Sequence, residues 1–369
     1  MRNVFEGYLR NDGSAGTRNY IGLISTVICS SVVTNEIAEQ VQNTVPIVHA
    51  NGCAQLGDDF QTTKNMLAGA AENPNFYAAL LIGLGCETNQ VTGLMKSLST
   101  NKPFEGFSIQ QMAGGTNTIE HGVKISREWA TQAAKEKRIT LPLSNLKVGI
   151  VMEDIDIESI HKMQPIVSDC IRELIQQNAT VVWALNKTIE PVSYKLAQQI
   201  KDEYLKEKLK SLSQGLTRKR WEKSTEYQLE KFSEDEEKLA LQASQLIEGL
   251  EIKSILNYNE KPKSDGLHLL KSSGSLVETL SNFASVGCNI TIILSKRSIM
   301  TGSSILPSVI VAPESAGIYG SDFLDYLIGN HPQSQTLLEK VIAISSGELT
   351  RLEHFNLGEF AIPHVGTTF

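Results

Sequence analysis

The sequence predicts an α/β protein with two Rossmann-like α/β domains, each built on a mainly parallel sheet. Its 369 residues exceed what one hydrophobic core usually holds. Short apolar runs alternate with amphipathic stretches between residues 19 and 138, which is typical of βαβ units. The segment Leu141–Asn145 interrupts this alternation, which then resumes. We therefore expect an N-terminal α/β domain over residues 1–143 and a C-terminal α/β domain over residues 144–369.

Four strands and four helices are expected in the N-terminal domain. The strands are expected at residues 20–26, 45–49, 78–84 and 107–109, and the helices at 30–42, 58–71, a stretch ending near 98, and 116–137. The first helix is expected to bury Val32, Val33, Ile37 and Val41 on one face. The second helix should end before Asn73–Asn75, because the central proline cannot continue it.

The C-terminal domain is expected to continue the same alternation. Strands are predicted at residues 147–152, 180–185, 290–294 and 308–312, and helices at 166–177, 323–327 and 337–344. Residues 193–250 are rich in Lys, Glu, Gln and Leu, which predicts one or two long charged helices acting as a solvated arm or an interaction surface. Acidic neighbours favour a solvated helix face over a phosphate contact for the basic cluster Arg218–Arg220.

Composition and charge exclude several classes of protein. Hydrophobic residues at 41% and charged residues at 20% are typical of a folded globular chain. The formal net charge of -7 gives no overall attraction to nucleic acid or to anionic lipid. No apolar run is long enough for a membrane span or a signal-peptide core, so we expect a cytoplasmic protein without a membrane partner. Five cysteines, an odd number spread through the chain, indicate reduced thiols.

Several side chains that can carry chemistry follow the predicted strands of the N-terminal domain. These residues are Cys29, His49, Cys53, Cys86, Glu87 and Gln110. Because ligands collect at the carboxyl ends of parallel strands, these residues are expected to line one crevice. The spacing of His49 and Cys53 is compatible with two metal ligands from one turn, although no Cys-x2-Cys pair is present. The alternative is that the cysteines pack as small buried hydrophobes.

Two further segments are candidates for holding an anionic substrate. Gly114, Gly115 and Thr116 open a helix, whose free N–H groups attract a carboxylate or phosphate. An ordinary helix start capped by Thr116 would show the same pattern. Arg10 and Arg18 flank a glycine-rich turn and could bind a carboxylate in a bidentate manner, although a salt-bridged turn would look alike.

Six motifs in the N-terminal domain resemble the altronate/galactarate dehydratase family, to which the large subunit of sulfolactate sulfo-lyase also belongs. The motifs, in chain order, are Arg10–Asn19, Cys29-Ser30, Gly52–Gln55, Leu67–Gly69 with Asn73–Phe76, Gly83–Glu87, and Ile109-Gln110 with Gly114–Thr116. Their shared order over residues 10–116 makes the resemblance specific.

The resemblance implies a lyase that removes water, or sulfite in the sulfo-lyase, from a hydroxylated acid. A proton is taken from the carbon next to a carboxylate, and a divalent metal, Fe(II) or Mn(II), stabilises the resulting charge. The residues expected at the site are Cys29, Cys53 and Cys86 as metal ligands, His49, Gln55, Glu87 and Gln110 as catalytic groups, and Arg10, Arg18, Gly114, Gly115, Thr116 and Arg297 as substrate contacts. It also implies a sugar acid as substrate, a separate small subunit and a homo-oligomer.

The C-terminal half departs from the family pattern. The family's Gln-Cys-Gly-Gly-Ser-Asp segment is replaced by Val151–Asp156, and its late Gly-Arg-Gly loop survives only as Arg297, Gly302 and Pro307. Acidic residues of the replaced segment are candidates to substitute for lost ligands. The alternative is a non-catalytic paralogue that acts as a partner subunit or binds an acid.

Overall fold

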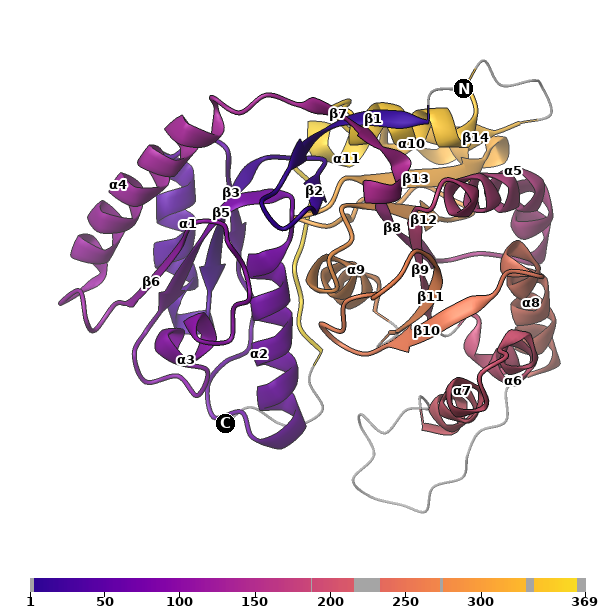
Figure 1. Cartoon of the computed structure of the whole chain (residues 1–369), viewed down its shortest axis with the longest axis horizontal. Coiled ribbons are helices and arrows are strands. Elements are labelled where there is room, and N and C mark those ends of the chain that lie inside the picture. Colours follow the sequence, from indigo (N-terminus) through magenta and orange to yellow (C-terminus); the bar gives the residue numbers. More distant parts are fainter. Residues whose placement is uncertain (1–2, 187, 216–232, 273–274, 330–334, 364–369) are drawn as a thin grey trace.

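A computed structural model describes residues 3–186, 188–215, 233–272, 275–329 and 335–363. It contains two parallel sheets, four-stranded with the order β4-β3-β5-β6 and seven-stranded with the order β10-β11-β9-β8-β12-β13-β14. Helices cover these sheets in two adjacent α/β units, the first in indigo and purple and the second in magenta to yellow (Figure 1). The predicted α/β class is therefore confirmed.

The four-stranded sheet lies in the N-terminal unit. Its elements are β3 (Tyr20–Ser25), α1 (Ser31–Gln40), β4 (Thr44–Ile47), α2 (Gly57–Glu72), β5 (Phe76–Gly83), α3 (Val91–Met95), β6 (Phe104–Ser108) and α4 (Gly115–Ala133), with a 3-10 turn at Ile28–Ser30. Helix α1 buries Val33 and Ile37, whereas Val32 is 71% exposed. The expectation for Val32 was wrong because a helix turns about 100° per residue, so adjacent residues face different directions.

The seven-stranded sheet forms the C-terminal unit. Its strands are β8 (Lys147–Met152), β9 (Thr180–Leu185), β10 (Ile252–Leu256), β11 (Gly266–Lys271), β12 (Ile290–Leu294), β13 (Ser308–Pro313) and β14 (Tyr326–Ile328). Its helices are α5 (Ile157–Gln176), α6 (Ser193–Leu196), α7 (Glu203–Gly215), α8 (Glu234–Ser244), α9 (Leu276–Ser285), α10 (Leu337–Ser345) and α11 (Arg351–His354). The helix predicted at 323–327 is wrong, because β14 pairs with β13 and alternately buries Tyr326 and Ile328.

The described parts of the charged segment 193–250, residues 193–215 and 233–250, are largely helical but are not wholly solvated. Helix α8 begins with a capping box at Ser233 and Glu236 and buries Ala240 and Ala243. It packs against α5 at the edge of the C-terminal unit (Figure 1). Residues 218–220, the basic cluster, lie outside the described residues.

A third sheet, which the sequence analysis missed, links the two units. Its strands are β1 (Val4–Leu9), β2 (Ala15–Gly16) and β7 (Ile139–Pro142), all antiparallel. It lies against the end of α10, where the Glu6 amide donates to Ser346 Oγ at 3.0 Å and Arg138 Nη1 donates to the Ser345 carbonyl at 3.2 Å. This sheet therefore ties both ends of the N-terminal unit to the C-terminal unit.

The two units share a buried interface in which α2 packs along α9. A Cβ on Gly69 would collide with the Ser285 carbonyl, which shows how closely these helices approach. Asn73 Nδ2 donates to the carbonyls of Ala284 and Cys288 at 2.7 and 2.9 Å. In the described part of the chain, no helix combines the length and the apolar character that a membrane span requires.

Candidate functional site

Three loops at the carboxyl ends of adjacent strands form the candidate site. Cys29 follows β3, Cys53 follows β4 and Cys86 follows β5, and these strands are neighbours in the sheet. Backbone hydrogen bonds hold the loops together beside each cysteine. The Ile28 amide donates to the Asn51 carbonyl at 3.0 Å, and the Thr88 amide donates to the Gly52 carbonyl at 3.4 Å. The sheet order therefore brings together cysteines that lie far apart in the sequence.

The thiols lie close enough to influence one another. Burial raises the pKa of the Cys53 thiol, and the charge of Cys29 and a hydrogen bond with it raise this pKa further. Cys86 and Glu87 raise the same pKa through their charges. Cys53 is half-buried, whereas Cys29 and Cys86 are exposed. Two exposed thiols, one half-buried thiol and one buried carboxylate therefore lie together where the three loops meet, and we call this place the crevice.

Glu87 is held in a fixed orientation beside the thiols. It is only 2% exposed. Its Oε1 accepts a hydrogen bond from Thr26 Oγ1 at 3.1 Å, and its Oε2 accepts one from the Gly85 amide at 2.6 Å. A Cβ on Gly83 would collide with this carboxylate, so a glycine at 83 leaves room for it. Thr26 and Gly85 position the carboxylate, and sequence reasoning missed both roles.

His49 uses both ring nitrogens for backbone contacts. Its Nε2 donates to the Ser25 carbonyl at 2.9 Å, and its Nδ1 accepts from the Asn51 amide at 3.2 Å. Burial lowers the pKa of this imidazole to about 4, although the contact with Ser25 opposes the shift. In this arrangement a neutral His49 orders the loop that carries Cys53.

Gln55 is the site's unsatisfied polar group. The residue is 4% exposed, and neither its Oε1 nor its Nε2 has a hydrogen-bond partner among the described residues. Leaving a buried polar group unpaired costs about 1–3 kcal/mol, so such groups normally have a partner. Gln55 lies two residues after Cys53 in the loop that follows β4, so this loop carries both a thiol and an unpaired amide.

The fourth strand of the sheet supplies the other edge of the site. Gln110 follows β6 and packs over Gly85, where a Cβ would collide with the Gln110 side chain. Gly85 has a φ of 120°, which other residues adopt only with strain. Helix α4 begins at Gly115 with Gly114 as its N-cap, so Thr116 is exposed in the first turn and is not the cap.

Comparison with known proteins identifies the family. Residues 7–134 match the domain described as D-galactarate dehydratase/altronate hydrolase, second domain, and residues 143–368 match D-galactarate/altronate dehydratase, C-terminal. The chain belongs to the galactarate/altronate dehydratase family. The resemblance seen in its N-terminal motifs is thereby confirmed, and it extends over the divergent C-terminal half.

The relatives of this dehydratase-family chain are distant but cover nearly all of it. The altronate dehydratase of Bacillus subtilis is 25% identical over 398 residues, spanning 99% of this chain and 78% of that protein. The altronate dehydratase of Escherichia coli is 26% identical, spanning 98% of this chain and 78% of that protein. The (2R)-sulfolactate sulfo-lyase subunit beta of Chromohalobacter salexigens is 24% identical, spanning 97% of both chains.

Arg10 and Arg18, which were expected to contact substrate, lie at the opposite edge of the N-terminal sheet from the thiols. They precede β3, so they lie near the amino ends of the strands. Arg10 donates to the Pro74 carbonyl at 2.8 Å and pairs with Glu136 at 3.2 Å. Arg18 is buried and pairs with Glu353 of the C-terminal unit through two hydrogen bonds of 2.7 Å. In this arrangement the Arg10 guanidinium links Pro74 to Glu136 within the N-terminal unit. The Arg18 guanidinium links the N-terminal unit to the C-terminal unit.

The third arginine, Arg297, lies at the carboxyl end of the C-terminal sheet, after β12. It forms an ion pair with Asp154, which also contacts Lys296 Nζ at 3.3 Å. Asp156 serves as the N-cap of α5 by accepting from the Ser159 amide at 2.8 Å. The acidic residues that replace the family's lost motif thus already have cationic or amide partners.

The described side chains do not form a site for a single metal ion. Among the described residues, no group of three or more His, Cys, Asp or Glu side chains is arranged to hold one metal ion. The imidazole of His49 and the carboxylate of Glu87 have protein partners for all the atoms that would bind metal. The crevice therefore offers three thiols as its available soft donors.

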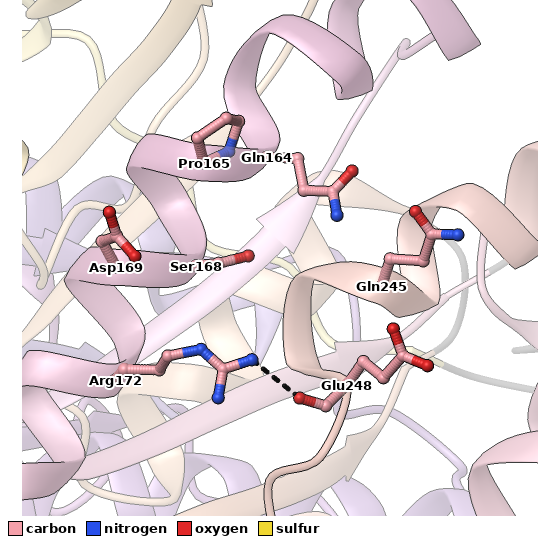
Figure 2. Close-up of a pocket in the computed structure, with 7 residues that line it drawn as sticks. All are labelled: Gln164, Pro165, Ser168, Asp169, Arg172, Gln245 and Glu248. Atoms are coloured by element: carbon pink, nitrogen blue, oxygen red, sulfur yellow. Dashed lines mark hydrogen bonds between the residues drawn. The ribbon is translucent and has the colours of Figure 1, made fainter.

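A pocket in the C-terminal unit is lined by residues whose contacts join neighbouring elements of the fold. Residues of α5 and of the segment after α8 line it, and Arg172 Nη2 donates to the Glu248 carbonyl at 2.8 Å across it (Figure 2). Ser168 Oγ also donates to a backbone carbonyl, that of Leu246, at 3.1 Å. These contacts hold α8 and the turn after it against α5.

Proposed function

We propose that this chain is a hydro-lyase that removes water from a sugar acid such as altronate or galactarate. Family membership over both units supports this proposal. The observation that carries it is the set of loops after β3, β4 and β5, which holds a fixed buried carboxylate, an unpaired buried amide and three thiols at the carboxyl ends of parallel strands. This is the edge at which ligands bind in open α/β sheets.

In the proposed reaction, a base removes the proton from the carbon next to the substrate carboxylate, and the hydroxyl on the following carbon takes up a proton and leaves as water. We assign the proton transfer to Glu87, whose carboxylate Thr26 and Gly85 hold in place. Gln55 and Gln110 are assigned to hydrogen bonds with the hydroxyls or the carboxylate of the substrate. The N-terminus of α4, which follows β6, offers N–H groups and a favourable dipole for the substrate carboxylate.

The experiment that tests this function measures the 2-keto acid formed from altronate, galactarate and sulfolactate. We expect turnover of at least one of them, and Glu87→Gln should lower kcat by about 10²–10⁴-fold because general acid–base catalysis contributes that much. Glu136→Gln is the matched control, since Glu136 pairs with Arg10 near the amino ends of the strands. Absence of turnover with all three acids, or equal losses in both variants, would contradict the proposal.

We also propose that another polypeptide covers the crevice. Three large apolar side chains beside the thiols are exposed, Ile28 by 45%, Val32 by 71% and Leu56 by 81%. The two altronate dehydratases are longer than the region this chain matches, and the sulfo-lyase relative is named as a subunit. Light scattering tests whether the covering polypeptide is a second copy of this chain or a separate small subunit. A homo-oligomer that Val32→Asp dissociates supports self-association, whereas a monomer contradicts self-association and leaves the separate small subunit to be tested.

A further inference from the structure

The two loops that follow β3 and β4 pack against each other through their backbones. The amide of Ile28, the residue before Cys29, donates to a backbone carbonyl of the loop after β4 at 3.0 Å. A Cβ on Gly52, the residue before Cys53, would lie 2.8 Å from the Cα of Val27, so a glycine is needed for this approach. Backbones that hydrogen-bond side by side lie about 4.5–5.5 Å apart, and a disulfide requires Cα atoms about 4.4–6.8 Å apart.

The side chains of the two cysteines in these loops also meet. A hydrogen bond joins the thiols of Cys29 and Cys53, and Cys86 acts on Cys53 through its charge. Cys29 is exposed and Cys53 is half-buried, so one sulfur of the pair is open to a small reagent in solution. The pair of Cys29 and Cys53 therefore combines backbone proximity, side-chain contact and access.

We propose that Cys29 and Cys53 form a reversible disulfide when the chain meets hydrogen peroxide. This modification site goes beyond the proposed hydro-lyase function and does not depend on it. The thiols are free in the structure, so the disulfide belongs to an oxidised form of the chain. Oxidation would tie the loop after β3 covalently to the loop after β4.

The disulfide forms in two steps. The sulfur of Cys29, the exposed member of the pair, attacks one oxygen of the peroxide. The O–O bond breaks, the thiol proton leaves with the other oxygen as water, and Cys29 becomes a sulfenic acid. The sulfur of Cys53 then attacks the sulfur of Cys29, the S–O bond breaks, and the hydroxyl leaves with the second thiol proton as water. Two thiols lose two electrons to one peroxide, and a dithiol reductant reverses the change.

The two cysteines of the C-terminal unit are protected from this chemistry. Cys170 and Cys288 are buried, and burial raises the pKa of each thiol to about 12. The thiolate is the form that reacts with peroxide, so both residues should stay reduced. They serve as controls within the same molecule.

The test treats the native full chain with a few equivalents of hydrogen peroxide, then alkylates the remaining thiols in denaturant and digests with trypsin. Cys29 and Cys53 leave in one tryptic peptide, residues 19–64, whereas Cys86 leaves in the next, residues 65–96. We expect peptide 19–64 to be lighter by two hydrogen atoms than its reduced form and to escape alkylation. Dithiothreitol before alkylation should restore both thiols. A protease that cuts after Glu36 and Glu39 should give two pieces that stay joined until reduction.

Variants identify the partners. Cys29→Ser and Cys53→Ser should each abolish the link within peptide 19–64. Cys86→Ser is the matched control, since it removes an exposed thiol of the same crevice and should leave the link intact. A link between peptides 19–64 and 65–96 would make Cys86 the partner and overturn the proposal. Unlinked sulfinic acids, or five thiols that all remain free, would overturn it as well. Because no readout uses turnover, the hydro-lyase function is tested separately.

Discussion

At the scale of single residues, the crevice separates groups that already have partners from groups that do not. Both ring nitrogens of His49 contact backbone groups, and each carboxylate oxygen of Glu87 accepts one hydrogen bond. Gln55 has no such contact among the described residues, and Cys29 and Cys86 face solvent. The contacts of the first kind fix the orientation of His49 and of the proposed base Glu87, and the groups of the second kind are free to contact a ligand.

The first prediction concerns the pH dependence of stability and rests on His49. Its pKa is about 4 in the folded chain against a usual 6.5, so protonation favours the unfolded chain. The contribution to stability is present above pH 6.5 and is lost as the pH falls toward 4, amounting to about 3 kcal/mol. Urea unfolding between pH 4 and 7 should show a flatter profile for His49→Gln. The exposed His161 supplies the control variant, His161→Gln, and a parallel loss in both would refute the assignment.

The second prediction concerns the unpaired amide of Gln55. Gln55→Met keeps the volume and removes two unsatisfied polar atoms, so the free energy of unfolding of the ligand-free chain should rise by about 1–3 kcal/mol. The same variant should lose activity. Gln61→Met is the control, since Gln61 lies on an exposed face and pairs with Asn65. Urea unfolding measures both, and a destabilised Gln55→Met would mean that the amide has a partner in solution.

At the scale of elements, the strands that were predicted most closely are those whose residues are almost all buried. Buried strands such as β9, β12 and β13 read as continuous apolar runs, and their bounds were predicted to within a residue. The strands β1, β2 and β7 were missed because their pairing joins residues 4–16 to 139–142 and leaves no local pattern. Strand β14 was predicted as a helix because three residues carry too little periodicity to distinguish the two.

The same reasoning explains how much of the site could be predicted. Local sequence placed the cysteines at strand ends, and the strand order of the sheet then decided which loops meet. The partners of His49 and Glu87 could not be predicted, because Ser25, Thr26 and Gly85 contact them through precise loop geometry. Such contacts leave no periodic signal in the sequence.

The third prediction concerns the packing of α2 on α9. In Gly69→Ala the added methyl group would meet the Ser285 carbonyl and the Asn259 side chain, so the free energy of unfolding should fall by about 1–3 kcal/mol. In Gly93→Ala, within α3, a Cβ meets no described atom within 4 Å. That control should stabilise the chain by up to about 1 kcal/mol, because alanine favours a helix over glycine. Thermal unfolding of both variants checks the difference, and similar effects would contradict this packing.

At the scale of the whole molecule, buried polar contacts hold the two units together. Asn75 Nδ2 donates to the carbonyls of Asn289 and Ile305 at 3.1 and 3.0 Å, across the interface. Near the crevice, Asn51 Nδ2 donates to the Ile362 carbonyl at 2.9 Å, where the yellow C-terminal segment descends between the units (Figure 1). The loop that carries Cys53 is therefore anchored by both halves of the chain. A change at the interface should reach the candidate site through this loop.

The last prediction tests that coupling through Arg18, which is 4% exposed and meets Glu353 of α11 through two hydrogen bonds of 2.7 Å. Burial pushes the pKa of Glu353 upward, but the hydrogen bonds and charge of Arg18, with those from Thr350, outweigh it and lower the pKa. The pair therefore stabilises the fold above the unfolded pKa of Glu353, and this contribution is lost as the pH falls through the folded value.

Arg18→Met leaves a carboxylate buried without its cation, so the free energy of unfolding at neutral pH should fall by about 3–5 kcal/mol. The exposed pair of Lys162 and Glu158 on α5 provides the control, since Lys162→Met should cost less than about 1 kcal/mol. Turnover of the hydroxy acid by the folded fraction shows whether the loop of Cys53 is affected by the change. A large loss of stability with unchanged turnover would mean that the N-terminal unit builds its crevice alone, and equal stability in both variants would refute the role of Arg18.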